Sequence, residues 1–294
     1  MITLYRPSGY DSPRASSFAG RSVDDKPLDV ENGSSFKEID TGRVFRYDKE
    51  NNLWIEQKST TGGAGATEPY IEETYDADGN LIGAKMYGYK KVRDGAFAGC
   101  SNLALTSLPA GVTSIGDGAF VNCSNLALTS LPAGVTSIGT EAFAGCSNLA
   151  LTSLPEGLTS IGEGAFVNCS NLALTSLPEG LTSIGRDVFS NCTSLALTSL
   201  PESLTSIGNY AFNYCTSLAL TSLPEGLTSI GKYAFANCTS LTSITFKSTP
   251  TTITSGAFDG CTNLTDIKVP WAEGTVANAP WVATNATITY NYTE

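Results

Sequence analysis

The eight cysteines are the residues whose spacing first suggests chemistry, because every interval between them is 23 residues. They are Cys100, Cys123, Cys146, Cys169, Cys192, Cys215, Cys238 and Cys261. Such a row suggests either disulfides or a metal site. The sequence contains no histidine and no C-x-x-C pair, so a zinc site lacks its usual ligands.

Disulfides between consecutive cysteines are disfavoured by distance. If each cysteine occupies one coil of a stacked structure, neighbouring side chains lie about 4.8 Å apart, beyond the roughly 3.8 Å that separates bridged Cβ atoms. Unpaired cysteine behaves as a small apolar residue. We therefore expect buried, unreactive thiols, no metal and no cofactor.

Acid–base catalysis is also not indicated. Histidine, the commonest general base, is missing. The carboxylates of Glu156, Glu179, Glu202 and Glu225 recur beside prolines, as expected of a solvated edge. A step of 23 residues that never varies leaves no inserted loop in which a nucleophile, a base and an oxyanion site could gather. We expect no catalytic residues and no enzyme.

The same period organises the apolar residues, which indicates a repeat architecture. A phenylalanine stands three residues before every cysteine, from Phe97 to Phe258, and isoleucines follow the step from Ile115 to Ile253. Within one unit, Leu151 to Leu154 and Leu158 to Ile161 predict two short strands. Gly164 to Cys169 spaces its apolar residues three apart, which predicts a helical or 3-10 turn. Each unit therefore predicts one coil of a solenoid.

The repeat Leu-x-x-Leu-Pro-x-x-Leu-Thr-Ser-Ile-Gly-x-x-Ala-Phe-x-x-Cys-x-x-Leu resembles the BspA-like branch of the leucine-rich repeats over about residues 89 to 266. This resemblance implies a right-handed solenoid of mainly short β-strands and a binding or adhesion role, because members are typically surface proteins of microbes and their viruses. Most units read Leu-Ala-Leu-Thr-Ser-Leu-Pro, and the usual family spacing appears only at Leu241 to Phe246. This departure leaves open which residues of the first strand face inward.

Charge divides the chain near residue 93. Residues 1 to 93 carry 15 acidic and 13 basic side chains, whereas residues 94 to 294 carry 13 acidic and 4 basic ones. The predicted organisation is an N-terminal β module for attachment (1–57), a flexible linker (58–68), an N-terminal hairpin cap (69–92), the repeat solenoid (93–266) and a C-terminal cap (267–294). Val92 is expected at the Ile115 position of a degenerate first coil, and Trp271 and Trp281 are expected to close the core.

The N-terminal module predicts a small β-meander, with strands at Ser35–Asp40, Arg43–Tyr47 and Leu53–Gln57. The stretch from Asp24 to Asp48 resembles a module at the N-termini of bacteriophage structural proteins. That resemblance implies attachment to other virion proteins.

Composition limits the partners and the location. The formal net charge of −11 opposes binding to nucleic acid or to an anionic membrane. The sequence has no run of 18 apolar residues, so no membrane insertion is expected. The first ten residues do not resemble a secretory signal. We expect synthesis in the host cytoplasm and incorporation into a virion, with the bacterial cell surface as the alternative location.

The recognition residues are expected where the units differ from one another, at the pair after each Gly and the pair after each Phe. The candidate ligand-binding residues are Arg186, Tyr210, Asn213, Tyr214, Lys232 and Tyr233. Tyrosine and arginine are enriched at binding hot spots.

These observations favour a non-enzymatic bacteriophage virion protein, a tail- or capsid-attached fibre or decoration protein. Its leucine-rich-repeat rod would serve receptor binding and host adhesion by contacting a bacterial surface glycan or protein. The alternatives are a bacterial cell-surface adhesin of the BspA-like type and an intracellular protein-interaction scaffold. No coiled-coil heptads appear, so a homo-oligomer would have to arise from the N-terminal module or from the symmetry of the particle.

Overall fold

A computed structural model of the chain describes the backbone of residues 3–7, 17–20, 35–38, 44–48 and 53–57, and residues 70–76 and 79–293. The chain divides into two compact units, residues 1–89 and 90–294, which are described separately. The described residues contain no helix, and accordingly none that could cross a bilayer.

The first unit contains a seven-stranded sheet in the order β5-β4-β3-β2-β1-β6-β7. Its strands are β1 (Thr3–Pro7), β2 (Ser17–Gly20), β3 (Ser35–Glu38), β4 (Val44–Asp48), β5 (Leu53–Gln57), β6 (Tyr70–Tyr75) and β7 (Leu81–Tyr87). Strands β3, β4 and β5 pair antiparallel as the expected meander. Strands β6 and β7 form the expected hairpin, and β6 also pairs with β1. The predicted linker 58–68 lies outside the described residues.

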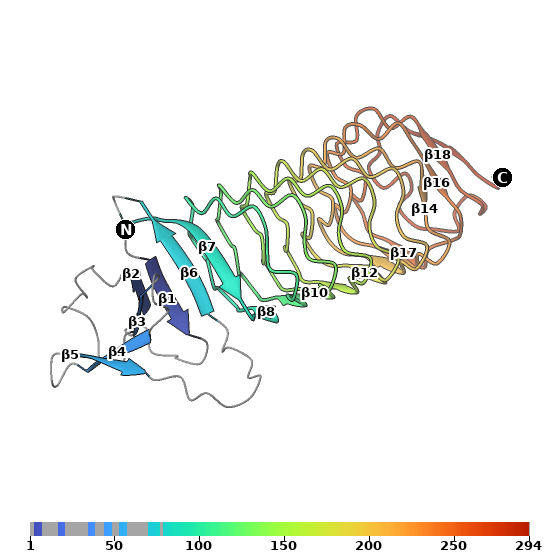
Figure 1. Ribbon diagram of the computed structural model, residues 1–294. Coiled ribbons are helices and arrows are strands. Elements are labelled where there is room, and N and C mark those ends of the chain that lie inside the picture. Colours follow the sequence, from blue (N-terminus) through green and yellow to red (C-terminus); the bar gives the residue numbers. More distant parts are fainter. Residues whose placement is uncertain are drawn as a thin grey trace. The chain divides into compact units, whose positions relative to one another are not determined.

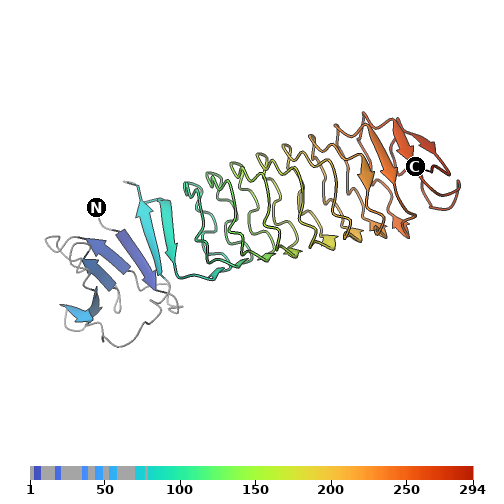
Figure 2. The same cartoon turned by 45° about the vertical axis from the view of Figure 1, so that its right-hand side comes forward.

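The second unit is a stack of coils, which Figures 1 and 2 show from two sides. One face carries a parallel two-residue strand from each coil. These are β8 (Lys91–Val92), β9 (Ser114–Ile115), β10 (Ser137–Ile138), β11 (Ser160–Ile161), β12 (Ser183–Ile184), β13 (Ser206–Ile207), β15 (Ser229–Ile230) and β17 (Thr252–Ile253). Val92 pairs with Ile115, as expected for a degenerate first coil. We call this surface the strand face.

The first strand predicted for each unit forms only toward the C-terminal end of the stack. There, β14 (Ser222–Leu223), β16 (Ser243–Phe246), β18 (Asp266–Lys268) and β19 (Thr287–Thr289) make a separate parallel sheet. The four-residue strand β16 falls at the segment with the usual family spacing. In a typical earlier coil, Leu149, Leu151 and Leu154 face inward without a regular strand.

The stretch between each Gly and Cys is a chain of tight turns. The residue spacing predicted a single helical or 3-10 turn there. In the third coil the N–H groups of Ala142, Ala144 and Cys146 donate to carbonyls three residues earlier, at 3.0 to 3.4 Å. The N–H groups between them, of Glu141, Phe143 and Gly145, donate to the next coil at 2.8 to 2.9 Å. A helix cannot form because every second donor is used to join neighbouring coils.

The core consists of columns that run along the stack. The phenylalanine rings from Phe97 to Phe258 are at most 1% exposed, and consecutive ring centroids lie 5.2 to 5.6 Å apart with planes within 14° of parallel. At the C-terminal end, Trp271 and Trp281 are buried against Phe246, and Trp281 also contacts Phe258. The N–H of Phe258 donates to the carbonyl of Trp281, so this last segment continues the coil-to-coil bonding.

Candidate functional site

Two positions in every coil have a left-handed backbone. The first is the third residue after the Val or Ile of the strand face, and the second is the residue before Cys. All eight residues of each column have φ between +52° and +80°. Glycine, asparagine and aspartate tolerate this region most easily, and they fill most of these sites.

Tyrosines occupy three of these left-handed positions. Tyr210 and Tyr233 stand in the first column, where the other coils have Gly, Glu or Asp, and Tyr214 stands in the second, where they have Gly or Asn. Their φ angles are +58°, +55° and +57°. A bulky side chain in this region costs roughly 1 kcal/mol or more. The chain keeps three aromatic residues in a conformation that Asn or Gly would adopt with less strain.

The structure brings part of the predicted recognition set together. The rings of Tyr210 and Tyr233 lie 5.4 Å apart at 34°, and the Lys232 ammonium lies 4.9 Å from the centre of the Tyr233 ring. The Tyr233 ring also covers Gly256, where an added Cβ would lie 2.5 Å from the ring. The two rings therefore contact each other in a tilted arrangement, and both side chains are half-buried.

The other three predicted residues differ in their exposure and their bonding. Tyr214 is 48% exposed, the highest value among the large apolar side chains that the structure describes. Asn213 is half-buried, and its N–H donates to the carbonyl of Tyr210 at 3.1 Å. Arg186 is exposed, and its Nε pairs with the Asp187 carboxylate at 2.9 Å. Arg186 is thus engaged within its own coil, with no recorded contact to the tyrosines.

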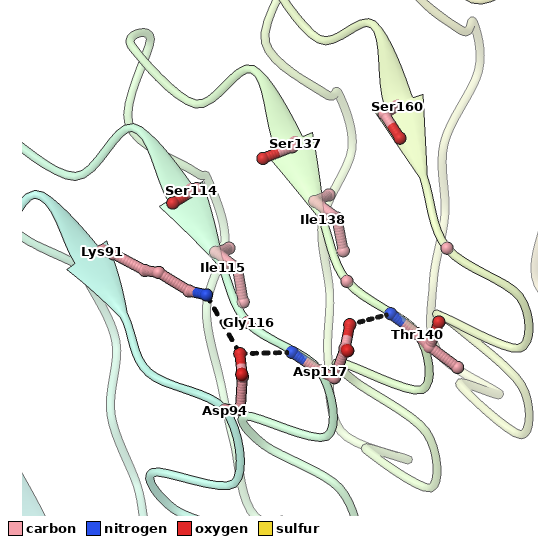
Figure 3. A pocket seen from close by; sticks show the side chains of 12 residues that line it. Lys91, Asp94, Ser114, Ile115, Gly116, Asp117, Ser137, Ile138, Thr140 and Ser160 are labelled. Atoms are coloured by element: carbon pink, nitrogen blue, oxygen red, sulfur yellow. Dashed lines mark hydrogen bonds and ion pairs between the residues drawn. The ribbon is translucent and has the colours of Figure 1, made fainter.

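Sequence reasoning missed the grooves on the strand face. One shallow groove runs from Lys91 to Gly162, and Figure 3 shows its side chains. A second runs from Glu163 to Thr254. The periodic Ser-Ile-Gly triplets could have located this face in the sequence, because each triplet places a polar serine on the strand and a glycine without a side chain directly after it.

The charged side chains of the first groove bond within the stack of coils. Asp94 accepts from the N–H of Asp117 and pairs with Lys91, both at 3.1 Å, and Asp117 accepts from the N–H of Thr140 at 2.8 Å (Figure 3). The hydrogen bond from Lys91, aided by that from the Asp117 N–H, lowers the pKa of Asp94. These carboxylates tie one coil to the next.

The cysteine column lies inside the stack. None of the eight cysteines is in a disulfide, and all but the half-buried Cys100 are buried. Each buried thiol donates to the carbonyl of the phenylalanine 26 residues earlier, as Cys146 does to Phe120 at 3.0 Å. Desolvation raises the pKa of Cys123 and of Cys261 to about 12 and raises the pKa of the five thiols between them.

The glutamate column forms an exposed edge. Glu202 pairs with Lys247, and a hydrogen bond from that ammonium lowers the pKa of the carboxyl. Within the part of the chain that the structure describes, no three His, Cys, Asp or Glu side chains lie close enough together to hold a metal ion.

Three solved structures resemble this chain. A leucine-rich repeat protein of T. pallidum is 31% identical, with 66% of this chain and 87% of that chain covered and a TM-score of 0.46. A leucine-rich repeat protein of Bacteroides ovatus is 22% identical, with 75% of each chain covered and a TM-score of 0.42. A leucine-rich cell surface protein of Faecalibacterium prausnitzii is 23% identical, with 92% and 96% covered and a TM-score of 0.40. No curated protein matches the chain.

The family comparison concerns the coils themselves. The model of the BspA-type leucine-rich repeat region matches six copies, over residues 90–219 and 188–276. These ranges contain the strand face, the phenylalanine and cysteine columns and all six predicted recognition residues. The chain belongs to the BspA-type leucine-rich repeat family.

Proposed function

We propose that this chain is a non-enzymatic binding protein that recognises its partner through the tyrosine edge, defined as Tyr210, Tyr214 and Tyr233 with Arg186, Asn213 and Lys232. The observation that carries the proposal is the placement of three tyrosines at left-handed positions. Backbone strain that a fold retains tends to mark functional sites.

The residues that occupy the same positions in neighbouring coils support this interpretation. Asn191 and Asn237 occupy the Tyr214 position in the two adjacent coils, and Gly256 follows Tyr233 in the first column. Asparagine or glycine at the tyrosine positions would relieve strain without changing the coil. Retention of strained residues at a cost in stability is expected where their side chains serve binding.

The proposed partner is a protein or glycan at a bacterial surface, and the proposed role is that of an adhesin. Membership in the BspA-type family supports this role better than the virion role. No comparison supports a bacteriophage-like module at residues 1–57. Attachment through that module therefore rests on the sequence resemblance alone.

Arrays of bacterial glycans and of surface proteins, probed with the labelled full chain, test the proposal. We expect binding to a limited set of spots, reduced at least about tenfold in the variant Tyr210→Asn/Tyr214→Asn/Tyr233→Asn. The matched control is Glu141→Asn/Asn168→Gly/Asn191→Gly, which alters left-handed positions in other coils. Undiminished binding by the tyrosine variant would refute the tyrosine edge as the recognition surface.

A stability measurement separates a loss of binding from a loss of folding. Tyr214→Asn should raise the free energy of unfolding by about 1 kcal/mol, because it removes strain from an exposed side chain. A variant that is more stable and yet binds less assigns these residues to recognition. A variant that unfolds more readily would assign Tyr214 to the support of the fold.

A further inference from the structure

We call the junction between two neighbouring coils a step. The backbone hydrogen bonds that join the coils on the strand face form a ladder, and this ladder is interrupted at one step. At six of the seven steps between β8 and β17, two N–H groups donate to the preceding coil at 2.7 to 3.1 Å. At the step from β10 to β11, for example, Thr159 donates to Thr136 and Gly162 donates to Ile138. At the step from β11 to β12, the structure records neither the bond from Thr182 nor the bond from Gly185. Accordingly, β11 ends one sheet and β12 begins another.

Glycine packing locates the same gap independently. An added Cβ would lie 2.3 Å from backbone of the preceding coil at Gly162, 2.7 Å at Gly208 and 2.5 Å at Gly231. At Gly185 the nearest atom of the preceding coil, Cγ of Glu163, is 3.7 Å away. The coils are therefore farther apart at Gly185 than at the equivalent glycines.

The burial and the hydrogen bonding of side chains at this step are consistent with the wider spacing of the two coils. Ile161 is half-buried, whereas the Val and Ile residues at the same position of the seven other coils are at most 4% exposed. The threonine hydroxyls on either side bond to the preceding coil, as Thr159 does to Thr136 and Thr205 does to Thr182. No such bond is recorded from the Thr182 hydroxyl.

The other sides of the same two coils remain joined. Gly164 donates to Arg186, Phe166 to Val188 and Asn168 to Ser190, each at 2.9 Å. The rings of Phe166 and Phe189 stack at 5.6 Å and 6°. The separation is thus confined to the strand face.

We propose that the solenoid contains a bending joint between β11 and β12. The coils before and after this step form two stiff stacks, connected along the phenylalanine and cysteine columns. The strand face at Ile161 and Gly185 opens and closes about that connection. Bending there changes the angle between the first groove, which lies before the step, and the second groove, whose lining residues other than Glu163 all follow the step.

Hydrogen exchange of the full chain tests whether the step is open. The amides of Thr182 and Gly185 should exchange about 10- to 100-fold faster than those of Thr205 and Gly208, which occupy the same positions one coil later. Equal protection of the two pairs would overturn the proposal, because it would mean that the ladder is continuous.

Alanine substitution provides a matched pair in identical Ser-Ile-Gly contexts. Gly185→Ala should leave the thermal midpoint within about 2 °C of the parent, whereas Gly208→Ala should lower it markedly or prevent folding, because its Cβ would meet backbone at 2.7 Å. A Gly185→Ala variant as damaged as Gly208→Ala would contradict the gap.

Distances between spin labels test the motion itself. In a Cys100→Ser background, Thr113→Cys/Thr182→Cys places labels on exposed sites across three steps that include the joint. Thr182→Cys/Thr252→Cys spans three steps without it. We expect a distance distribution at least about twice as broad for the first pair. Equal widths would show that the step is open but does not bend.

Discussion

Raising the pH should destabilise the folded solenoid, because the cysteines buried in its core resist deprotonation. A buried thiol keeps its proton because the thiolate cannot be solvated inside the core. The pKa values of Cys123 and Cys261 are about 12 in the folded state, against an ordinary value of 9.0. Above pH 9 the unfolded chain therefore loses thiol protons that the folded chain retains.

The sign and size follow from proton linkage. Below pH 9 both states carry neutral thiols, so these groups add no pH dependence. Between about pH 9 and pH 12 the unfolded state binds fewer protons, so the free energy of unfolding falls as the pH rises. At pH 10 each buried thiol reduces it by about 1.4 kcal/mol, and seven such thiols together reduce it by about 10 kcal/mol, which is comparable to the whole stability of a typical domain.

Circular dichroism during thermal unfolding, from pH 8 to pH 10.5 at constant ionic strength, measures this effect. The variant Cys169→Ala/Cys192→Ala/Cys215→Ala removes three of the seven buried thiols and should lose about three-sevenths of the decline in stability with pH. A wild-type midpoint that is independent of pH, or the same decline in the variant, would refute the reasoning.

Two further predictions concern the core columns. Phe166→Ala should lower the free energy of unfolding by about 3 to 5 kcal/mol in chemical denaturation, because the side chain is fully buried between stacked rings, and a loss below about 1 kcal/mol would contradict the stack. A thiol reagent should modify Cys100, the half-buried member of the column, before any other cysteine in the native protein. Prompt reaction of several thiols without denaturant would show that the column is accessible.

Periodicity was sufficient to predict the coils. Phe and Cys recur at 23 residues without an insertion, so each must occupy the same place in every turn, and both columns are buried as expected apart from the half-buried Cys100. The second strand predicted for each unit, at Leu158 to Ile161, was readable in part: Gly162 ends it as expected, but the structure forms it only at Ser160–Ile161. The family match over residues 90–276 agrees with this reading.

The local geometry of the turns was harder to read. Three-residue apolar spacing predicted a helical or 3-10 turn at Gly164–Cys169, but residue spacing does not reveal bonds made to another coil. A signal was present in the two variable columns, where glycine, asparagine and aspartate recur at a fixed place. That recurrence is typical of left-handed backbone, and it would have distinguished Tyr210 and Tyr214 as strained residues.

The gap between β11 and β12 has no counterpart in the sequence pattern. Ser-Ile-Gly occurs at both Gly185 and Gly208, yet the neighbouring coil is distant at one and close at the other. The difference arises from how whole coils stack, so it became visible only in three dimensions.

A crystal structure phased on sulfur would test the central claim most directly. The account predicts eight anomalous cysteine peaks in one interior row, about 4.8 Å apart, and positive φ angles at Tyr210, Tyr214 and Tyr233. Scattered sulfur positions would contradict the stacked coils, and negative φ angles at the tyrosines would remove the strain on which the proposed recognition surface depends.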